Sequence, residues 1–216
     1  MRSSKALFAV AACATALSSV QAAESGEVFA GVGSTGFELG YGYKLGSDIG
    51  VRTEAQFLNL GRKFEDDDAT YDAKLKFSSL GVYADYFFGS VFRVTGGALF
   101  GTRKVTGTGV ATGGTITING TSYPAAGESI TLDAKFPGVA PYLGLGLGHG
   151  QSSEGLGMYF DAGVALGRAK VKLTPSAGLL AAAGQANVDA EQVKVQDNLD
   201  KLRAYPVVKI GVTYNF

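Results

Sequence analysis

The chain has 216 residues, of which 19 are basic and 19 acidic, so its formal net charge is zero. A balanced charge argues against nucleic-acid binding, which requires a strongly basic surface. Glycine, with 32 residues, is about twice as frequent as in an average protein. No run of about 18 apolar residues is present, so no transmembrane helix is expected. A membrane protein of this kind would have to be a closed barrel, because lipid cannot satisfy the open edge of a sheet.

The first 22 residues have the pattern of an export signal. Arg2 and Lys5 precede an apolar stretch over residues 6–17, and Val20-Gln21-Ala22 fits a small-residue cleavage site. The apolar stretch is too short to span a bilayer as a helix. We therefore predict a signal peptide over residues 1–22, with 23–216 as the folded unit.

An alternative reading of this region is a lipobox, Val10-Ala11-Ala12-Cys13, which would make Cys13 a lipidated N-terminus. Cleavage there would leave a very short signal and a long apolar remainder. Cleavage after Ala22 would instead give a chain without cysteine, which needs no disulfide in an oxidising compartment. Its 17 basic and 19 acidic residues would carry a formal charge of −2.

Eight segments alternate between apolar and polar or small residues, which is the period of a strand with two different faces. They cover residues 27–33, 36–46, 49–60, 71–88, 91–106, 131–148, 157–173 and 205–216. An even number of strands brings both ends of the chain to the periplasmic side, with short inner turns and longer outer loops. The sequence therefore predicts an all-β fold, an eight-stranded antiparallel transmembrane up-and-down β-barrel.

One parity of these segments is apolar and is predicted to face lipid. It includes Phe37, Leu39, Val51, Phe57, Leu80, Val82, Phe92, Val94, Leu143, Leu145, Met158 and Phe160. Aromatic residues gather at the short-turn ends of the segments, where an interfacial girdle is expected.

The opposite parity is glycine-rich and charged, and is predicted to face the lumen. Its charged members are Glu38, Arg52, Glu54, Asp85, Arg93, Arg103, Asp161 and Lys209. Isolated charges in a narrow interior would be costly, so these acids and bases are expected to pair. An eight-stranded barrel is only just wide enough for its own side chains. We therefore expect a lumen filled by ion pairs.

The outer loops at 61–70, 107–130 and 174–204 contain three recognisable features. Residues 115–123 predict a hairpin that turns at Asn119-Gly120. Residues 188–203 predict a helix capped by Asn187 or Asp189, because Val188, Val195, Leu199 and Leu202 share a face. The acidic run 65–68 predicts a solvated loop, with divalent-cation binding at a lipopolysaccharide surface as the alternative.

The last strand ends with an alternating pattern in which Lys209, Gly211, Tyr214 and Phe216 stand out. This pattern resembles the terminal signal that the barrel-assembly machinery reads in bacterial outer-membrane barrels. With Tyr142-Leu143-Gly144-Leu145-Gly146 and Tyr205-Pro206-Val207, it makes nearly all of residues 23–216 resemble the small OmpA/OmpX-like barrels. The resemblance implies the cell outer membrane of a Gram-negative bacterium, with lipid, lipopolysaccharide and the assembly machinery as partners.

Two further patterns resemble functional sites. Gly31-x-Gly33-x-x-Gly36 matches a dinucleotide fingerprint, but the following residues alternate as a strand where that motif needs a helix. His149, the only histidine, falls in an inner turn beside Ser152 and Ser153, and is predicted to be solvated. We accordingly expect no catalytic residue, no metal site and no cofactor.

Three functions of different classes remain open at this point. The first choice is an outer-membrane barrel with a structural or surface-interaction role. The alternative is a narrow channel for small or apolar solutes, by analogy with small barrels that have lateral openings. A lipid-modifying enzyme is less favoured, because such an enzyme would place its histidine near the outer rim. A fold by itself does not decide among these functions.

Overall fold

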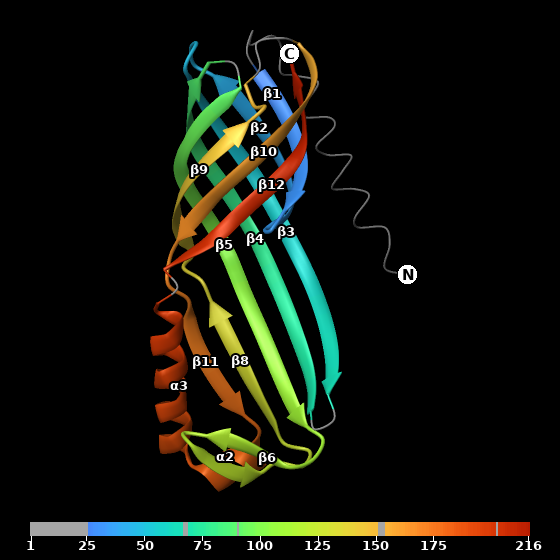
Figure 1. Ribbon diagram of the computed structural model, residues 1–216, viewed down its shortest axis with the longest axis vertical. Helices are drawn as coiled ribbons and strands as arrows, with labels where there is room; N and C mark the ends of the chain where they lie inside the picture. The colour runs from blue at the N-terminus through green and yellow to red at the C-terminus, as the bar shows by residue number, and fades with distance from the viewer. Residues whose placement is uncertain (1–25, 67–68, 90, 151–153, 202) are drawn as a thin grey trace.

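Eight antiparallel strands close into a ring, as the sequence predicted (Figure 1). The computed structural model describes residues 26–66, 69–89, 91–150, 154–201 and 203–216. The predicted signal peptide lies outside these described residues. The ring contains β1 (Gly26–Gly33), β2 (Gly36–Lys44), β3 (Ile49–Asp66), β4 (Ala69–Phe88), β5 (Phe92–Ala111), β9 (Val139–Leu147), β10 (Gly155–Leu166) and β12 (Ala204–Asn215). The β1–β12 pairing closes it, with Gly33 opposite Lys209 and Glu27 opposite Asn215.

Three strands of the ring continue far beyond it. β3, β4 and β5 have 18, 20 and 20 residues, whereas β1 and β2 have 8 and 9. A 20-residue strand is about 66 Å long, roughly twice the thickness of the hydrocarbon layer. The predicted outer loop at 61–70 is therefore wrong, because β3 runs to Asp66 and β4 starts at Ala69. Residues 67 and 68 of the acidic run lie outside the described residues.

The strand β5 changes its partner along its length. Phe92 to Phe100 pair with β9, and Lys104 to Val110 pair with β8 (Ser129–Lys135). The single strand predicted over 131–148 is therefore two strands, interrupted at residues 136–138. Pro137 explains the break, because it has no backbone N–H for the ladder. The segment 157–173 is likewise divided, into β10 and β11 (Lys170–Pro175).

The predicted hairpin at 115–123 is confirmed. β6 (Thr115–Ile118) pairs with β7 (Thr121–Pro124) across a two-residue turn. Asn119 and Gly120 have φ angles of 52° and 82°, and positive φ at both positions is what a tight hairpin of this kind requires.

Two helices follow β11 where one was predicted. α2 spans Ala177–Ala183 and α3 spans Gln185–Leu199, and Gly184, with φ of 77°, separates them. The predicted start near Val188 and the predicted caps Asn187 and Asp189 are therefore wrong. No helix within the described ranges is long and apolar enough to cross a membrane.

The outer part of the molecule has a small apolar core of its own. Its buried members are Ile118, Leu173, Leu179, Ala183 and Val188, from β6, β11, α2 and α3. Partly buried Ile130 and Leu132 of β8 pack against them. We call β8, β11, the β6–β7 hairpin and the two helices the outer module; Figure 1 shows it beside the extended end of β5.

The helix α3 covers the free edge of β11. The backbone N–H of Val171 donates to Oε1 of Gln196 at 2.8 Å, and that of Leu173 donates to Oε1 of Gln192 at 2.9 Å. An exposed strand edge invites pairing with another chain. Two glutamine side chains on successive turns of α3 satisfy this edge.

Candidate functional site

The two faces of the ring differ in chemistry as the alternation predicted. Large apolar side chains cover the outside; Phe37 is 72% exposed and Leu145 is 64% exposed. The inside holds buried charged groups, among them Glu38, Arg52, Glu54, Asp85, Arg93, Asp161 and Lys209. The charged lumen is therefore the candidate functional site.

Arg52 and Arg93 form the centre of one cluster. Arg52 Nε donates to Asp85 Oδ2 at 2.5 Å, and Arg93 Nη1 donates to Asp85 Oδ1 at 3.1 Å. Arg93 also donates to Asp161, and Arg52 Nη1 lies 3.5 Å from Asp161 Oδ2. Two guanidinium groups thus bridge two carboxylates that come from strands on different sides of the ring. We call this group the Arg52–Arg93 cluster.

His149 belongs to this cluster, and its predicted place in a solvated turn is wrong. The side chain is 1% exposed and packs on the rings of Phe29 and Tyr159, with centroids 4.6 and 4.1 Å away. Nδ1 lies 2.7 Å from Oε1 of Glu27, and Nε2 lies 3.3 Å from Nη1 of Arg52. Because an arginine can only donate, Nε2 is the acceptor and Nδ1 carries the proton given to Glu27.

Glu27 is held by donors from three directions. Besides His149, its carboxylate accepts the backbone N–H of Gly150 at 2.9 Å and the hydroxyl of Thr213 at 3.0 Å. The turn after β9 therefore folds back into the barrel and closes its inner end.

A second cluster surrounds Lys209. The ammonium group lies 3.1 Å from Oε2 of Glu38 and also donates to Glu54. Tyr159 donates to Glu38, and Tyr83 donates to Glu54 with an oxygen–oxygen distance of 2.6 Å. We call this group the Lys209 cluster. It links β2, β3, β4, β10 and β12, so one polar network connects most of the ring.

Glycines make room for these large side chains. A Cβ on Gly31 would overlap the hydroxyl of Tyr159, and a Cβ on Gly146 would overlap Asp161 and Arg93. The glycines that resembled a nucleotide motif thus lie in β1 and at the start of β2, where Gly31 and Gly33 face Tyr159 and Lys209.

A small cavity lies among the charged side chains at the inner end of the lumen. The cavity among Glu27, Arg52, Asp85 and Phe87 has a volume of about 10 Å³, which is close to the minimum for a single water molecule. Toward the outer end, Tyr83, Leu99, Tyr142 and Val207 pack into an apolar layer across the ring. The charged clusters and this apolar layer therefore lie one after the other along the inside of the ring.

Arg103 does not join the ion pairs, contrary to the prediction. Its guanidinium is buried, but its hydrogen bond goes from Nη2 to the backbone oxygen of Pro137 at 2.5 Å. Among the described residues it makes no salt bridge. The reason is its height in the barrel: it lies where β5 leaves β9, beyond both clusters.

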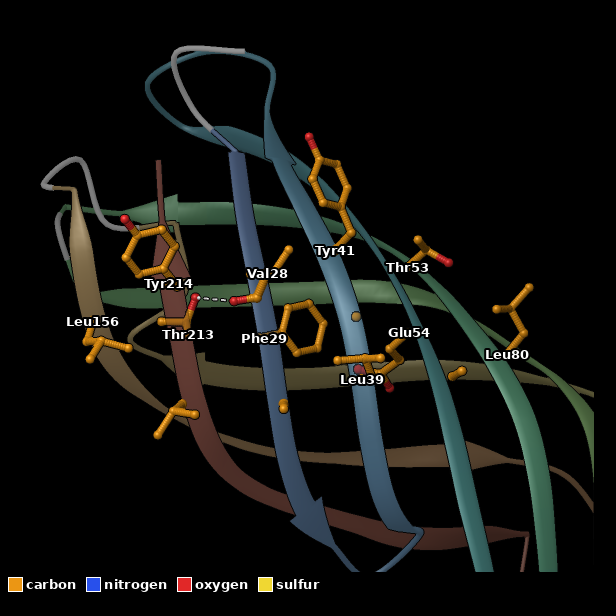
Figure 2. Close-up of a pocket in the computed structure, with 14 residues that line it drawn as sticks. Val28, Phe29, Leu39, Tyr41, Thr53, Glu54, Leu80, Leu156, Thr213 and Tyr214 are labelled. Atoms are coloured by element: carbon orange, nitrogen blue, oxygen red, sulfur yellow. Dashed lines mark hydrogen bonds between the residues drawn. The ribbon is translucent and has the colours of Figure 1, made fainter. Parts of the chain in front are cut away.

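A groove lies on the outside of the barrel, where β12, β1, β2 and β3 run side by side (Figure 2). Its volume is about 500 Å³. Ala30, Thr53 and Ala55 form low points between the larger side chains of Leu39, Tyr41 and Tyr214. The groove is therefore an apolar hollow in the outward face of the sheet.

The residues of the predicted assembly signal occupy the seam between β12 and β1. Phe216 exchanges two backbone hydrogen bonds with Gly26, at 3.0 and 3.1 Å. The rings of Tyr214 and Phe216 stack with centroids 6.3 Å apart. Gly211 lies opposite Gly31, and Lys209 points into the lumen.

Sequence reasoning missed several members of the lumen. Glu27, Tyr159 and Thr213 have the inward parity of their strands, so the alternation could have found them. His149 carried no such signal, because the direction of a turn side chain has no periodicity. In the part of the chain that the structure describes, no group of three or more His, Cys, Asp or Glu side chains could hold a metal ion.

Known proteins share the fold with this chain but little sequence. No protein-family model matches it, and no curated protein matches it. The crystal structure of Acinetobacter baumannii CarO matches with a TM-score of 0.64 and 20% identity, over 88% of this chain and 97% of CarO. The structure of A. baumannii CarO2 matches with a TM-score of 0.67 and 19% identity, over 89% of this chain and 98% of CarO2. Likeness at this level of identity supports the barrel fold.

Proposed function

We propose that the protein is an integral outer-membrane β-barrel with a structural or surface-interaction role, whose lumen is closed by its ion pairs. The observation that supports this proposal is the set of ion pairs on the inside of the ring. The Arg52–Arg93 and Lys209 clusters, with the apolar layer above them, occupy the path along which a solute would pass. A barrel whose lumen offers no path to a solute would act through its surfaces.

The outward face supports a place in a lipid bilayer. Apolar side chains such as Phe37, Leu145 and Met158 are exposed around the ring, and water would not favour so large an apolar surface. Acyl chains of membrane lipid would fill the groove beside Leu39 and Tyr214. Export by the predicted signal over residues 1–22 and insertion by the barrel-assembly machinery belong to the same proposal.

The surface role is proposed for the parts beyond the ring. The long ends of β3, β4 and β5 and the outer module carry the chain well past the thickness of the membrane. In the outer membrane they would stand among and above the sugars of lipopolysaccharide. The apolar core of the outer module, which includes Ile118 and Leu179, would hold this part of the surface in one defined shape.

We propose no enzymatic role. His149 lies at the inner end of the barrel, and both its ring nitrogens are engaged by Glu27 and Arg52. Neither nitrogen is therefore available as a general base for a substrate at the outer rim.

Conductance of the refolded protein in a planar bilayer tests this function. We expect the wild type to conduct very little and Arg93→Ala to conduct more. The new current should favour cations, because Asp85 and Asp161 would remain. A steady wild-type conductance that Arg93→Ala leaves unchanged would reject the closed lumen and favour the narrow channel for small solutes.

A further inference from the structure

The outer mouth of the barrel contains a second, separate cavity. It lies where β5 changes partner from β9 to β8, and Phe136, which follows β8, is part of its wall. Its volume is about 190 Å³. Thr35, Phe77, Arg103, Val105, Phe136 and Tyr205 line it. The Lys209 cluster lies deeper in the barrel than this cavity, because Gly33, two residues before Thr35, pairs with Lys209.

Arg103 faces this cavity with unused hydrogen-bond donors. The side chain is 1% exposed, and its one hydrogen bond joins Nη2 to the oxygen of Pro137. Its Nε and Nη1 atoms have no hydrogen-bond partner among the described residues. The other two buried arginines of the barrel, Arg52 and Arg93, each reach two carboxylates.

A buried guanidinium without an anion is physically unfavourable. Arginine stays charged at every physiological pH, so it cannot relieve the cost of burial by losing a proton. An uncompensated buried charge is strongly destabilising, and the usual solution is a paired anion. Arg103 therefore points to an anionic ligand.

Two hydroxyl groups converge on the same cavity. Thr35 Oγ1 and Tyr205 Oη are buried and have no hydrogen-bond partner within the described part of the chain. Both can donate to an oxygen anion. Together with the end of Arg103 they form a set of donors from three separate strands or turns.

The remaining wall is apolar and partly aromatic. Phe136 and Tyr205 pack edge to face with centroids 5.1 Å apart, and Phe77 and Val105 complete the wall. A bare inorganic anion would find no partner on this side. A cavity of about 150 Å³ can hold benzene, so the observed volume suits a ligand of slightly greater size.

We propose that this cavity binds a small organic monocarboxylate with an apolar body. The carboxylate would lie at Arg103 with the hydroxyls of Thr35 and Tyr205, and the body would pack against Phe77, Val105 and Phe136. Binding at the mouth needs no passage through the lumen, so the inference is independent of the proposed function.

Calorimetric titration of the refolded protein in detergent micelles tests this site with benzoate and benzamide as probes. The two molecules have nearly the same shape, but only benzoate is charged. We expect benzoate to bind the wild type at least tenfold more tightly than benzamide. Equal affinity for the two, or no binding of benzoate at all, would overturn the proposal.

Arg103→Gln removes the charge and keeps a polar, although shorter, side chain. We expect it to weaken benzoate binding at least tenfold, whereas Arg62→Gln, on the exposed end of β3, should leave binding unchanged. Heat-modifiable gel mobility shows whether each variant has folded. If Arg103→Gln does not fold, competition decides the question in the wild type, where chloride should not displace benzoate at equal concentration. Displacement of benzoate by an equal concentration of chloride would overturn the proposal that the ligand has an apolar body.

Discussion

Arg93 lies between two acids from different strands, so its removal affects both. Its Nη1 atom is 3.1 Å from Asp85, its Nη2 atom bonds Asp161, and its side chain is fully buried. We expect Arg93→Ala to lower the free energy of unfolding by about 3–5 kcal/mol, because two buried carboxylates lose a partner. Urea titration of the refolded barrel measures this loss.

Two further variants make that test specific. Replacing Arg93 and Asp161 together should cost less than the sum of the single changes, because fewer charges are left alone. The pair of exposed Lys74 and half-buried Asp72, at 3.1 Å, is the matched control. Lys74→Ala should change the free energy of unfolding by under about 1 kcal/mol. An Arg93→Ala effect as small as the control would show that the cluster contributes little to stability.

The buried position of His149 also has a measurable cost. His149→Ala would remove a donor from Glu27 and leave a hollow between Phe29 and Tyr159. We expect a loss of about 2–4 kcal/mol from the unsatisfied carboxylate and the cavity. His149→Asn, which can still donate, should cost less, and Ser47→Ala in the exposed β2–β3 turn should cost under about 0.5 kcal/mol. Equal unfolding midpoints for all three variants would contradict the buried position of His149.

At the scale of single elements, α3 stabilises the edge of β11 by accepting two of its backbone hydrogen bonds. Gln192→Ala would free the N–H of Leu173, and Gln196→Ala that of Val171. Each hydrogen bond is worth about 1 kcal/mol, so we expect roughly fivefold faster amide exchange at the freed N–H. Gln185→Ala, which removes only a bond to exposed Asp189, is the control. Unchanged exchange at both amides would mean that the helix merely lies beside the strand.

The strands of the ring could be predicted because each has lipid on one face and a filled lumen on the other. That contrast gives β2, with Phe37 and Leu39 outside and Glu38 inside, a clear period of two. The contrast disappears beyond the membrane. Lys63 and Glu65 on β3 look like loop residues, although their backbones pair with Asp72 and Thr70 of β4.

Other features were hidden for different physical reasons. The inward fold of the turn after β9 depends on Glu27, about 120 residues away, and no local pattern announces it. The position of Arg103 depends on where β5 changes partner, which is a property of the assembled sheet. Pro137, in contrast, was a visible signal that the strand over 131–148 would break.

At the scale of the whole molecule, the seam between β1 and β12 depends on the last residues. Phe216 forms two backbone hydrogen bonds with Gly26, and the Tyr214 ring stacks on that of Phe216. We expect deletion of Phe216, or Ser at both aromatic positions, to reduce insertion into the outer membrane while export continues. Phe64→Ser, on the exposed end of β3, should leave insertion intact. Normal outer-membrane levels and normal heat-modifiable mobility of the Phe216 variants would contradict the assembly signal.

The same seam has a consequence for the rate of folding. It pairs residues 27–33 with 209–215, so its contacts join positions separated by nearly the full length of the described chain. The hairpins β2–β3 and β4–β5 join neighbours and can form early, whereas the seam must wait for the largest loop to close. Folding rates fall as such distant contacts accumulate. Until β12 pairs with β1 and β10, the edges of these two strands are free to pair with other chains. This is the stage of folding at which the chain is most prone to aggregate.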